Sequence, residues 1–211
     1  MNTIRVSITK HLVKSPMIEV EQKFLLNPEQ EAKLLEGATL DYEKVNVDIF
    51  FDDDYYSLGK QDVWLRNRNG RWELKIGHKL SPGSLSRTYE ELEEDGLIAT
   101  WLGLPGEDLT QEILNAGYKQ FAKIEKARRS YLREGFRLDL DKCDFGYDVA
   151  EIELLIDSID GQQEANDKIA AFAKSIGLDN TPLRGKPVEY LYRFLPDHYQ
   201  ALLEAGVLDK I

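Results

Sequence analysis

The chain has a single cysteine, Cys143, among its 211 residues. One cysteine cannot build an internal disulfide framework, so we expect a reducing compartment and a cytoplasmic protein. Long apolar runs are also lacking. None approaches the ~20 residues that span a bilayer, and the N-terminus has no apolar core of a signal peptide. A membrane is therefore not an expected partner.

Positive charge is in short supply. The 27 Lys and Arg residues stand against 38 Asp and Glu residues, which gives a formal net charge of −11. An acidic surface disfavours nucleic acid or anionic lipid as the main partner. Any basic residues that bind a ligand must then be local and enclosed. Apolar residues are plentiful at 42%, which indicates a packed globular protein.

The familiar motifs of several enzyme classes are absent. The chain contains no phosphate-binding P-loop, no dinucleotide-binding glycine fingerprint and no nucleophile elbow. The three histidines are scattered and Cys143 has no partner at metal-ligand spacing, which disfavours zinc. The run Asp52-Asp53-Asp54 lacks the glycine and terminal glutamate of an EF-hand, so we interpret it as a solvated turn.

Several short segments alternate charged with apolar side chains. Successive side chains of a strand point to opposite faces, so Glu19, Glu21 and Lys23 would share one face. The same alternation recurs at 64–68, 73–75, 138–141 and 150–154. One such strand would be a solvated sheet face. Several strands, some acidic and some basic, predict a closed or strongly curved sheet with a charged interior.

The chain is interpreted as one α+β domain with a mostly antiparallel sheet of seven to nine strands and four or five helices. Strands are expected at 17–26, 40–52, 63–67, 71–76, 87–92, 122–133, 135–141 and 148–156. Helices are expected at 28–36, 107–115, 162–176, 187–195 and 197–205. The dipeptide Asn69-Gly70 predicts a tight hairpin turn. Residues 77–86 are expected to form a mobile loop, and residues 1–16 an N-terminal extension.

Two constellations of charge could carry chemistry. The acidic one comprises Glu19, Glu21, Asp139, Glu151 and Glu153. Carboxylate oxygens on different strands suit the octahedral preference of Mg²⁺ or Mn²⁺. The basic one comprises Lys23, Arg66, Arg68, Lys75, Arg129 and Lys186. Such side chains grip phosphate oxygens. The plainer alternative is that the acids lie on solvated faces and pair weakly with the bases.

The order of these segments resembles the CYTH superfamily, also called the triphosphate tunnel metalloenzymes. The signature is Glu19-Val-Glu21-Gln-Lys23, followed by Asp62-Val-Trp64-Leu-Arg66-Asn-Arg68, Trp72-Glu-Leu-Lys75, Tyr89-Glu-Glu91-Leu, Arg137-Leu-Asp139-Leu-Asp141, Glu151-Ile-Glu153 and Tyr190-Leu-Tyr-Arg193-Phe. Within the superfamily, these segments most resemble the thiamine triphosphatases of animals. The resemblance implies an eight-stranded antiparallel β-barrel, open as a tunnel with helices packed outside, formed by a single domain over residues 17–211.

The resemblance also implies the site. Glu19, Glu21, Asp139, Glu151 and Glu153 would bind Mg²⁺, and Lys23, Arg66, Arg68, Lys75, Arg129, Glu151 and Lys186 would bind the triphosphate. Trp64 would face the organic end of the substrate, and Glu151, Glu153 and Lys75 would be catalytic. The implied reaction is Mg²⁺-dependent hydrolysis of thiamine triphosphate to thiamine diphosphate and phosphate by a monomer. The general base stays open between Glu151, Glu153 and a hydroxide on the metal.

One departure from the family pattern bears on the substrate. The family's Tyr-Tyr-Asp is Phe50-Phe51-Asp52 here, so a tyrosine hydroxyl is missing. Hydrolysis of inorganic triphosphate is therefore an alternative, with the same basic residues but a polar rather than aromatic tunnel mouth. A non-catalytic polyphosphate-binding domain is a second alternative, which would keep the bases and tolerate loss of the acids.

Overall fold

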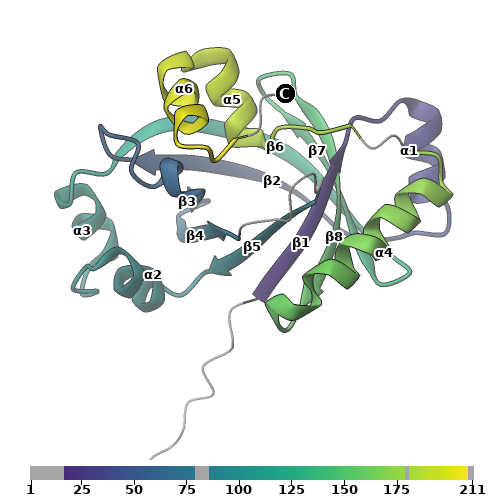
Figure 1. Ribbon diagram of the computed structural model, residues 1–211, viewed down its shortest axis with the longest axis horizontal. Helices are drawn as coiled ribbons and strands as arrows, with labels where there is room; N and C mark the ends of the chain where they lie inside the picture. The colour runs from purple at the N-terminus through teal and green to yellow at the C-terminus, as the bar shows by residue number, and fades with distance from the viewer. Residues whose placement is uncertain (1–16, 79–85, 179–180, 209–211) are drawn as a thin grey trace, which may run out of the picture.

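The computed structural model describes residues 17–78, 86–178 and 181–208 (Figure 1). The expected N-terminal extension and most of the expected loop at 77–86 lie outside these residues. The strands are β1 (Met17–Phe24), β2 (Thr39–Asp52), β3 (Val63–Arg68), β4 (Arg71–Gly77), β5 (Arg87–Leu92), β6 (Lys119–Arg133), β7 (Phe136–Cys143) and β8 (Asp148–Ile156). The helices are α1 (Pro28–Leu35), α2 (Asp95–Leu102), α3 (Leu109–Asn115), α4 (Gln162–Ser175), α5 (Lys186–Phe194) and α6 (Pro196–Glu204).

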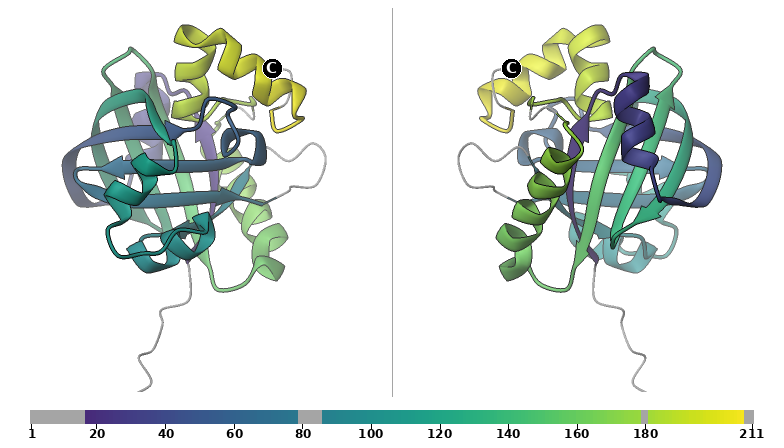
Figure 2. Two further views of the ribbon diagram at one scale, coloured as in Figure 1. Left: turned by 90° about the vertical axis from the view of Figure 1, so that its left-hand side faces the viewer. Right: turned by 90° about the vertical axis from the view of Figure 1, so that its right-hand side faces the viewer.

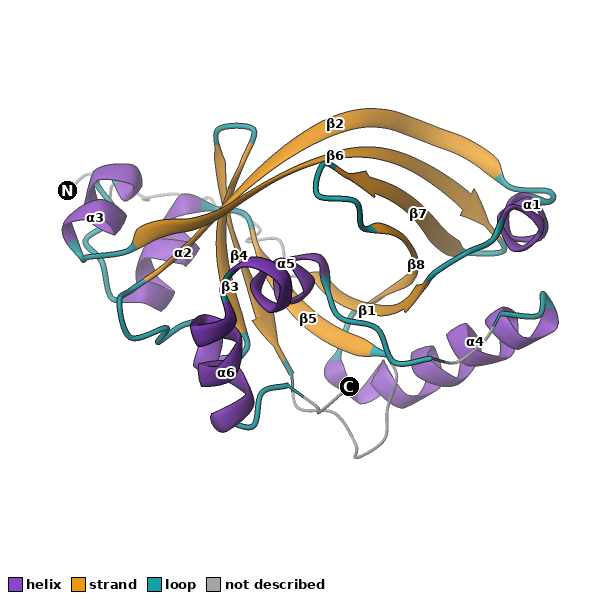
Figure 3. Cartoon of the chain, turned by 90° about the horizontal axis from the view of Figure 1, so that it is seen from above, coloured by secondary structure: helices purple, strands orange, loops and turns teal. Residues whose placement is uncertain are grey.

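The eight strands close into a barrel. Their order around it is β1-β5-β4-β3-β2-β6-β7-β8, and β8 pairs back onto β1. Every pairing is antiparallel. Figure 3 shows the long strands β2 and β6 arching on the side of the barrel opposite β1 and β5. The predicted α+β fold with an eight-stranded antiparallel barrel is confirmed.

Two hairpins are closed by tight two-residue turns. Asn69 and Gly70, between β3 and β4, both have positive φ angles of 50° and 89°. That backbone twist matches the twist of the flanking strands, and the sequence predicts this turn correctly. Glu134 and Gly135 join β6 to β7 with φ angles of 52° and 85°. This second turn places a glutamate in a conformation that glycine or asparagine tolerates better.

Most buried apolar residues lie beneath the helices in three separate clusters. Helix α4 packs on β1 and β8 and covers Val20, Leu138 and Ile152 with its own Ile169 and Phe172. Helices α5 and α6 cover Phe50, Trp64 and Ile124, and α2 and α3 cover Leu65, Trp72 and Leu74. The two side views show these helices on different sides of the barrel (Figure 2). The barrel interior is lined mostly by polar and charged side chains, with Phe50, Trp64 and Ile124 as apolar exceptions.

The structure corrects the sequence analysis at two places. Helix α2 is an additional helix, so six α-helices form in the described residues where four or five are expected. It has only eight residues and contains Gly96, which leaves little periodic signal. The second correction concerns Asp52, which is buried rather than solvated. Its carboxylate accepts the backbone N–H groups of Asp53, Leu58 and Gly59 at 2.8–3.0 Å and so shapes the loop after β2.

None of the helices in the described part of the chain combines the length and the apolar character needed to cross a membrane.

His198 of α6 is an uncharged histidine in an aromatic setting. Its ring stacks on Tyr56, with centroids 4.0 Å apart, and meets the edge of Phe121 at 4.7 Å. Neither ring nitrogen has a hydrogen-bond partner among the described residues. Burial, with a smaller contribution from Lys60, lowers the pKa of His198 to about 4. Among the described residues one carboxylate is paired with it, that of Asp52, which lies 3.9 Å from Nε2 and already accepts backbone N–H groups.

This histidine predicts a pH dependence of stability. Its pKa is lower in the folded chain than its ordinary value of 6.5, so between pH 7 and pH 5 the unfolded chain takes up a proton that the folded chain refuses. The wild type should lose about 2 kcal/mol more unfolding free energy over this interval than His198→Phe, which keeps the ring contacts and cannot titrate. Urea unfolding of both proteins at the two pH values measures this difference. Equal losses would contradict it.

Candidate functional site: a charged tunnel

The barrel encloses one cavity of about 570 Å³. Its wall is made by the inward-facing side chains of the strands, and the first turn of α5 contributes Lys186. Glu19, Glu21 and Lys23 of β1 all point inward, while Val20 between them packs under α4. The charged face that the sequence predicts for this strand therefore points into the barrel.

Eleven of the twelve predicted site residues line this cavity. They are Glu19, Glu21, Lys23, Trp64, Arg66, Arg68, Lys75, Asp139, Glu151, Glu153 and Lys186. The barrel register explains why distant segments meet: Glu153 pairs with Glu21 across β1 and β8, and Asp139 pairs with Glu151 across β7 and β8. The structure thus brings together residues that are more than 160 positions apart in the chain.

The exception is Arg129, which the structure places outside the barrel. Its Nη2 lies 2.6 Å from Glu31 Oε1 of α1, and its side chain is 35% exposed. The preceding residue, Arg128, points into the cavity instead. Two adjacent arginines leave the strand register ambiguous. In the structure Ile124 and Lys126 share the inward face of β6 with Arg128, and both are buried in the cavity wall.

Glu151 is the centre of the first group of ion pairs. Its carboxylate lies 2.6 Å from Lys186 Nζ, 3.1 Å from Arg128 Nη2 and 3.3 Å from Lys23 Nζ. Burial opposes ionisation, but these cations hold the pKa of Glu151 well below its ordinary range. Arg128 also donates to Asp139 and, at 2.6 Å, to Asp141. Three basic residues from three elements are thereby directed at one point in the tunnel.

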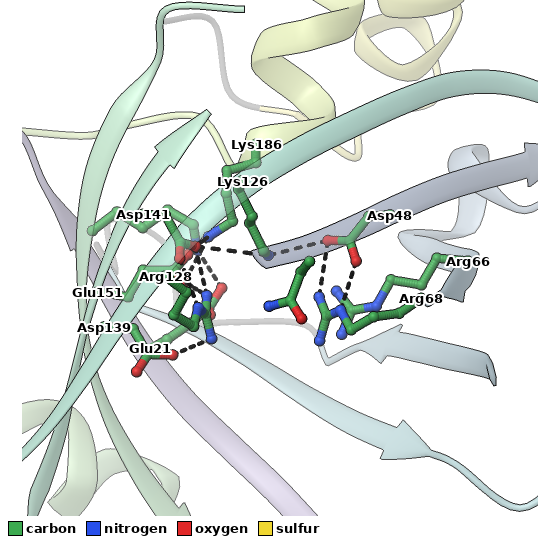
Figure 4. A network of polar contacts seen from close by, with 12 residues as sticks. Glu21, Asp48, Arg66, Arg68, Lys126, Arg128, Asp139, Asp141, Glu151 and Lys186 are labelled. Carbon is green, nitrogen blue, oxygen red and sulfur yellow. Dashed lines mark hydrogen bonds and ion pairs between the residues drawn. The ribbon is translucent and has the colours of Figure 1, made fainter. Parts of the chain in front are cut away.

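Asp48 of β2 is the centre of the second group. It accepts two hydrogen bonds from Arg68, at 2.6 and 3.0 Å, and lies 3.1 Å from Lys126 Nζ. Lys126 also lies 3.7 Å from Asp141, so this fully buried lysine links the two groups (Figure 4). Burial and the cations Arg128 and Lys186 lower the pKa of Lys126 to about 7. Lysine in such a place carries its charge only with carboxylate support.

The basic residues of β3 and β4 form the third group. Arg66 donates from Nε to Glu73 at 2.6 Å, and Lys75 Nζ lies 2.8 Å from Glu19 and 3.1 Å from Glu91. Burial opposes the charge of Lys75, but these carboxylates raise its pKa well above its ordinary value. Lys75 also lies over the Tyr89 ring, 4.5 Å from its centroid. These bases face the tunnel from the wall that adjoins the acids of β1.

Two overlapping triplets of carboxylates could hold a divalent cation. Glu19, Glu21 and Glu153 form one triplet, and Asp139, Glu151 and Glu153 form the other, each with ligand oxygens within 4.8 Å of one another. One oxygen of Asp139 is buried with no hydrogen-bond partner in the described residues. Burial, Glu19 and Asp139 raise the pKa of Glu153 well above its ordinary value. A hard cation would relieve this repulsion, so the donor set fits Mg²⁺ or Mn²⁺.

Several tunnel residues are absent from the predicted site. Arg128, Lys126, Asp48, Glu73, Glu91 and Tyr89 all line the cavity, and Asp141 pairs with the bases beside it. Glu73 and Asp141 alternate in phase with the predicted Lys75 and Asp139, so the same face rule selects them. The others lie on β2, β5 and β6, where no predicted residue marks the inward face. Asp48 in particular lies on the inward face of β2 together with Phe50.

One end of the tunnel is apolar and aromatic. Phe50, Trp64, Ile124 and Val188 line the cavity and also belong to the apolar cluster beneath α5 and α6. Tyr89 packs against the same cluster. A ligand in the tunnel would thus meet charged groups along most of its length and aromatic rings near α5.

Comparison with known proteins agrees with this architecture. Residues 17–182 match the family model of the CYTH domain. Human thiamine-triphosphatase is 32% identical over 90% of this chain and 91% of its own length, and the Macaca fascicularis thiamine-triphosphatase is 31% identical with the same coverage. A solved Pyrococcus horikoshii protein superposes with a TM-score of 0.62 at 23% identity, over 83% of this chain and 98% of that one.

A second solved structure, of a Hippeastrum protein, superposes with a TM-score of 0.57 at 18% identity, over 85% of this chain and 98% of that one. At this identity the likeness concerns the fold. The family model, however, spans most of the described residues, and the human relative matches along nearly the whole chain. The chain belongs to the CYTH family.

Proposed function

We propose that this protein is a Mg²⁺-dependent triphosphatase that cleaves the terminal phosphoryl group of thiamine triphosphate, giving thiamine diphosphate and phosphate. The observation that carries the proposal is the composition of the tunnel. One cavity holds converging lysines and arginines, clustered carboxylates and an aromatic end. A small-molecule ligand with a polyanionic tail and a flat organic head matches all three. A monomeric state and a cytoplasmic location stay predictions.

The bases would bind the triphosphate. Arg66, Arg68, Arg128 and Lys186 already point into the tunnel, held there by carboxylates. Because the side chains are fixed before the substrate arrives, little ordering is needed when phosphate oxygens replace or share these contacts. Arginine can grip such oxygens with two parallel hydrogen bonds. This arrangement would offset the charge that moves onto the bridging oxygen as the terminal group leaves.

The carboxylates would perform two tasks. Glu19, Glu21, Asp139, Glu151 and Glu153 would hold the metal, whose positive charge would polarise the phosphate oxygens. Of the two glutamates proposed to activate water, Glu151 is tied to three cations, whereas Glu153 is surrounded by other acids. Both glutamates stay candidates for the group that accepts a proton from the attacking water, because a bound cation would change the proton affinity of each. Lys75, between Glu19 and Glu91, would stabilise the negative charge nearby.

The aromatic end supports thiamine over inorganic triphosphate. A thiazolium cation is attracted to an aromatic face, and Trp64 lies in the tunnel wall on the same strand as Arg66 and Arg68. A tunnel for inorganic triphosphate would have no use for these rings. The named activity of the human relative points the same way. Phe50 lies in this wall without a hydroxyl, so the proposed contact with the organic group rests on stacking rather than on a tyrosine hydrogen bond.

The presence of all five predicted metal-binding acids in the tunnel argues against a domain that only binds polyphosphate. Binding needs the bases alone, and clustering like charges without a cation is costly. Side-by-side turnover of thiamine triphosphate, inorganic triphosphate and ATP by the full chain is the direct test. Thiamine triphosphate should give the highest kcat/KM. Turnover of none of the three would overturn the proposal.

Metal dependence should be absolute. The clustered carboxylates cannot all be ionised in one tunnel without a cation, so a chelator should abolish turnover and Mg²⁺ should restore it. Glu19→Gln removes one ligand charge and should chiefly raise the Mg²⁺ concentration needed for half-maximal activity. A Mg²⁺ titration of both proteins measures this shift. Full turnover in excess chelator would contradict the metal site.

Arg128 and Arg129 form a matched pair, because they are neighbours on β6 that face opposite sides of the wall. Arg128→Ala removes a proposed phosphate contact and should lower kcat/KM at least ~10-fold, or about 1.4 kcal/mol of transition-state stabilisation. Arg66→Ala and Arg68→Ala should do the same. Arg129→Ala breaks the contact with Glu31 outside the barrel and should change kcat/KM less than ~2-fold. Equal losses for both neighbours would show that tunnel placement is irrelevant.

Trp64 should determine substrate choice. Trp64→Ala removes the ring proposed to stack on the organic group, so hydrolysis of thiamine triphosphate should fall far more than that of inorganic triphosphate, by about 10-fold in relative kcat/KM. Parallel kinetics with both substrates measure the ratio. A common factor for both would indicate that Trp64 only packs, and would favour the inorganic-triphosphate alternative.

A further inference from the structure

Asp62 lies just before β3, at the aromatic end of the tunnel. Its Oδ1 accepts a hydrogen bond from Trp64 Nε1 at 3.0 Å. It forms no ion pair with any residue in the described ranges, although most other acids around the tunnel do. The loop that carries it is firmly placed, because Asp62 donates its backbone N–H to Gly59 and accepts that of Gly77 at 2.8 Å. A partly buried carboxylate is thus aimed at an indole rather than at a base.

Gly77 makes room for this carboxylate. A Cβ atom at position 77 would lie 2.1 Å from Asp62 Oδ2, closer than any real contact. Gly77 has no left-handed backbone angle that would itself call for glycine. The absence of a side chain is therefore explained by the position of the Asp62 carboxylate. Across the ladder, Gly77 pairs with Tyr89, whose ring lines the tunnel.

The carboxylate lies close to the tunnel wall. It lines a small cavity together with Lys23, Tyr89, Gly185 and Val188, and these four residues also line the tunnel. Burial raises the pKa of Asp62, while the Trp64 hydrogen bond and the charges of Arg87 and Lys75 oppose that shift. The carboxylate is thus placed beside Trp64 and Tyr89, in a small cavity that Arg87 and Arg184 also line.

We infer that Asp62 is a specificity-determining residue, which orients Trp64 and gives the aromatic end a negative charge, so that the tunnel prefers a triphosphate carrying a cationic aromatic group. This inference rests on the proposed function. A carboxylate bonded to the indole N–H fixes the plane of the ring and enriches its face in electrons, which strengthens attraction for a cation. The same charge repels an inorganic polyanion. Asp62 is a positioning residue, because it acts through Trp64.

The test compares three triphosphates. Thiamine triphosphate carries a cationic head group and ATP carries an aromatic but neutral one. Inorganic triphosphate has no head group. Asp62→Asn keeps an oxygen for the indole N–H, tolerates the left-handed φ of 58° at this position and removes only the charge. It should lower kcat/KM for thiamine triphosphate relative to the other two by about 5-fold. The change should appear mainly in KM, because head-group binding is the same in the ground and transition states.

Two further variants reach the same contact by different routes. Gly77→Ala displaces the carboxylate without removing it, and Asp62→Gly removes it without straining the backbone; both should shift the ratio in the same direction by about 10-fold. In a Trp64→Phe background there is no indole N–H that could donate to residue 62. Asp62→Asn should therefore change the kcat/KM ratio less in this background than in the wild type. Asp54→Asn is the matched control, since Asp54 is an exposed acid paired with Lys119, and it should leave the ratio unchanged.

The outcomes separate the inference from the proposed function. Ratios within ~2-fold of wild type for Asp62→Asn, Asp62→Gly and Gly77→Ala would overturn the role of Asp62 and leave a triphosphatase in place. A wild type that hydrolyses inorganic triphosphate but not thiamine triphosphate would overturn both the role of Asp62 and the proposed thiamine substrate, and would leave a triphosphatase in place. A wild type that hydrolyses none of the three would overturn both. A selective loss for the cationic substrate supports the inference.

Discussion

The structure depends on one constraint: charges taken into a barrel must be paired. Removing an ion from water costs several kcal/mol, and attraction in the interior repays this only when partners are close and well oriented. Here Glu151 contacts three cations, and Asp48 joins Arg68 to Lys126. The result is a continuous network rather than isolated pairs. The network fixes the direction of each base before any ligand arrives, which is the preorganisation that phosphoryl transfer requires.

The same constraint explains the placement of the helices. A barrel with a charged interior cannot build its core inside, so its apolar residues face outward and need cover. Three helical groups provide it, each over its own apolar cluster. The two kinds of surface meet beneath α5, where Trp64 and Val188 belong both to an apolar cluster and to the tunnel wall. The aromatic end of the site is thus a consequence of how α5 closes the barrel.

The acids of the tunnel differ in their proton affinity, because their neighbours differ in charge. Glu151 is surrounded by cations and its pKa is held low, whereas Glu153 is surrounded by acids and its pKa is raised. Two glutamates separated by one residue therefore have opposite proton affinities. Environments that separate the pKa values of neighbouring acids are typical of catalytic sites. Asp62 adds a third situation, a carboxylate that bonds to an indole.

The sequence by itself determined the strands and most of their inward faces, because strand alternation is a local property of two-residue period. It therefore placed Glu19, Glu21 and Lys23 on one face correctly. Tertiary structure decided what local patterns leave open. Adjacent arginines have no register of their own, so only pairing of β6 with its neighbours shows that Arg128 faces inward and Arg129 outward. Closure of the barrel likewise decided which charges meet, because it brings β8 against β1.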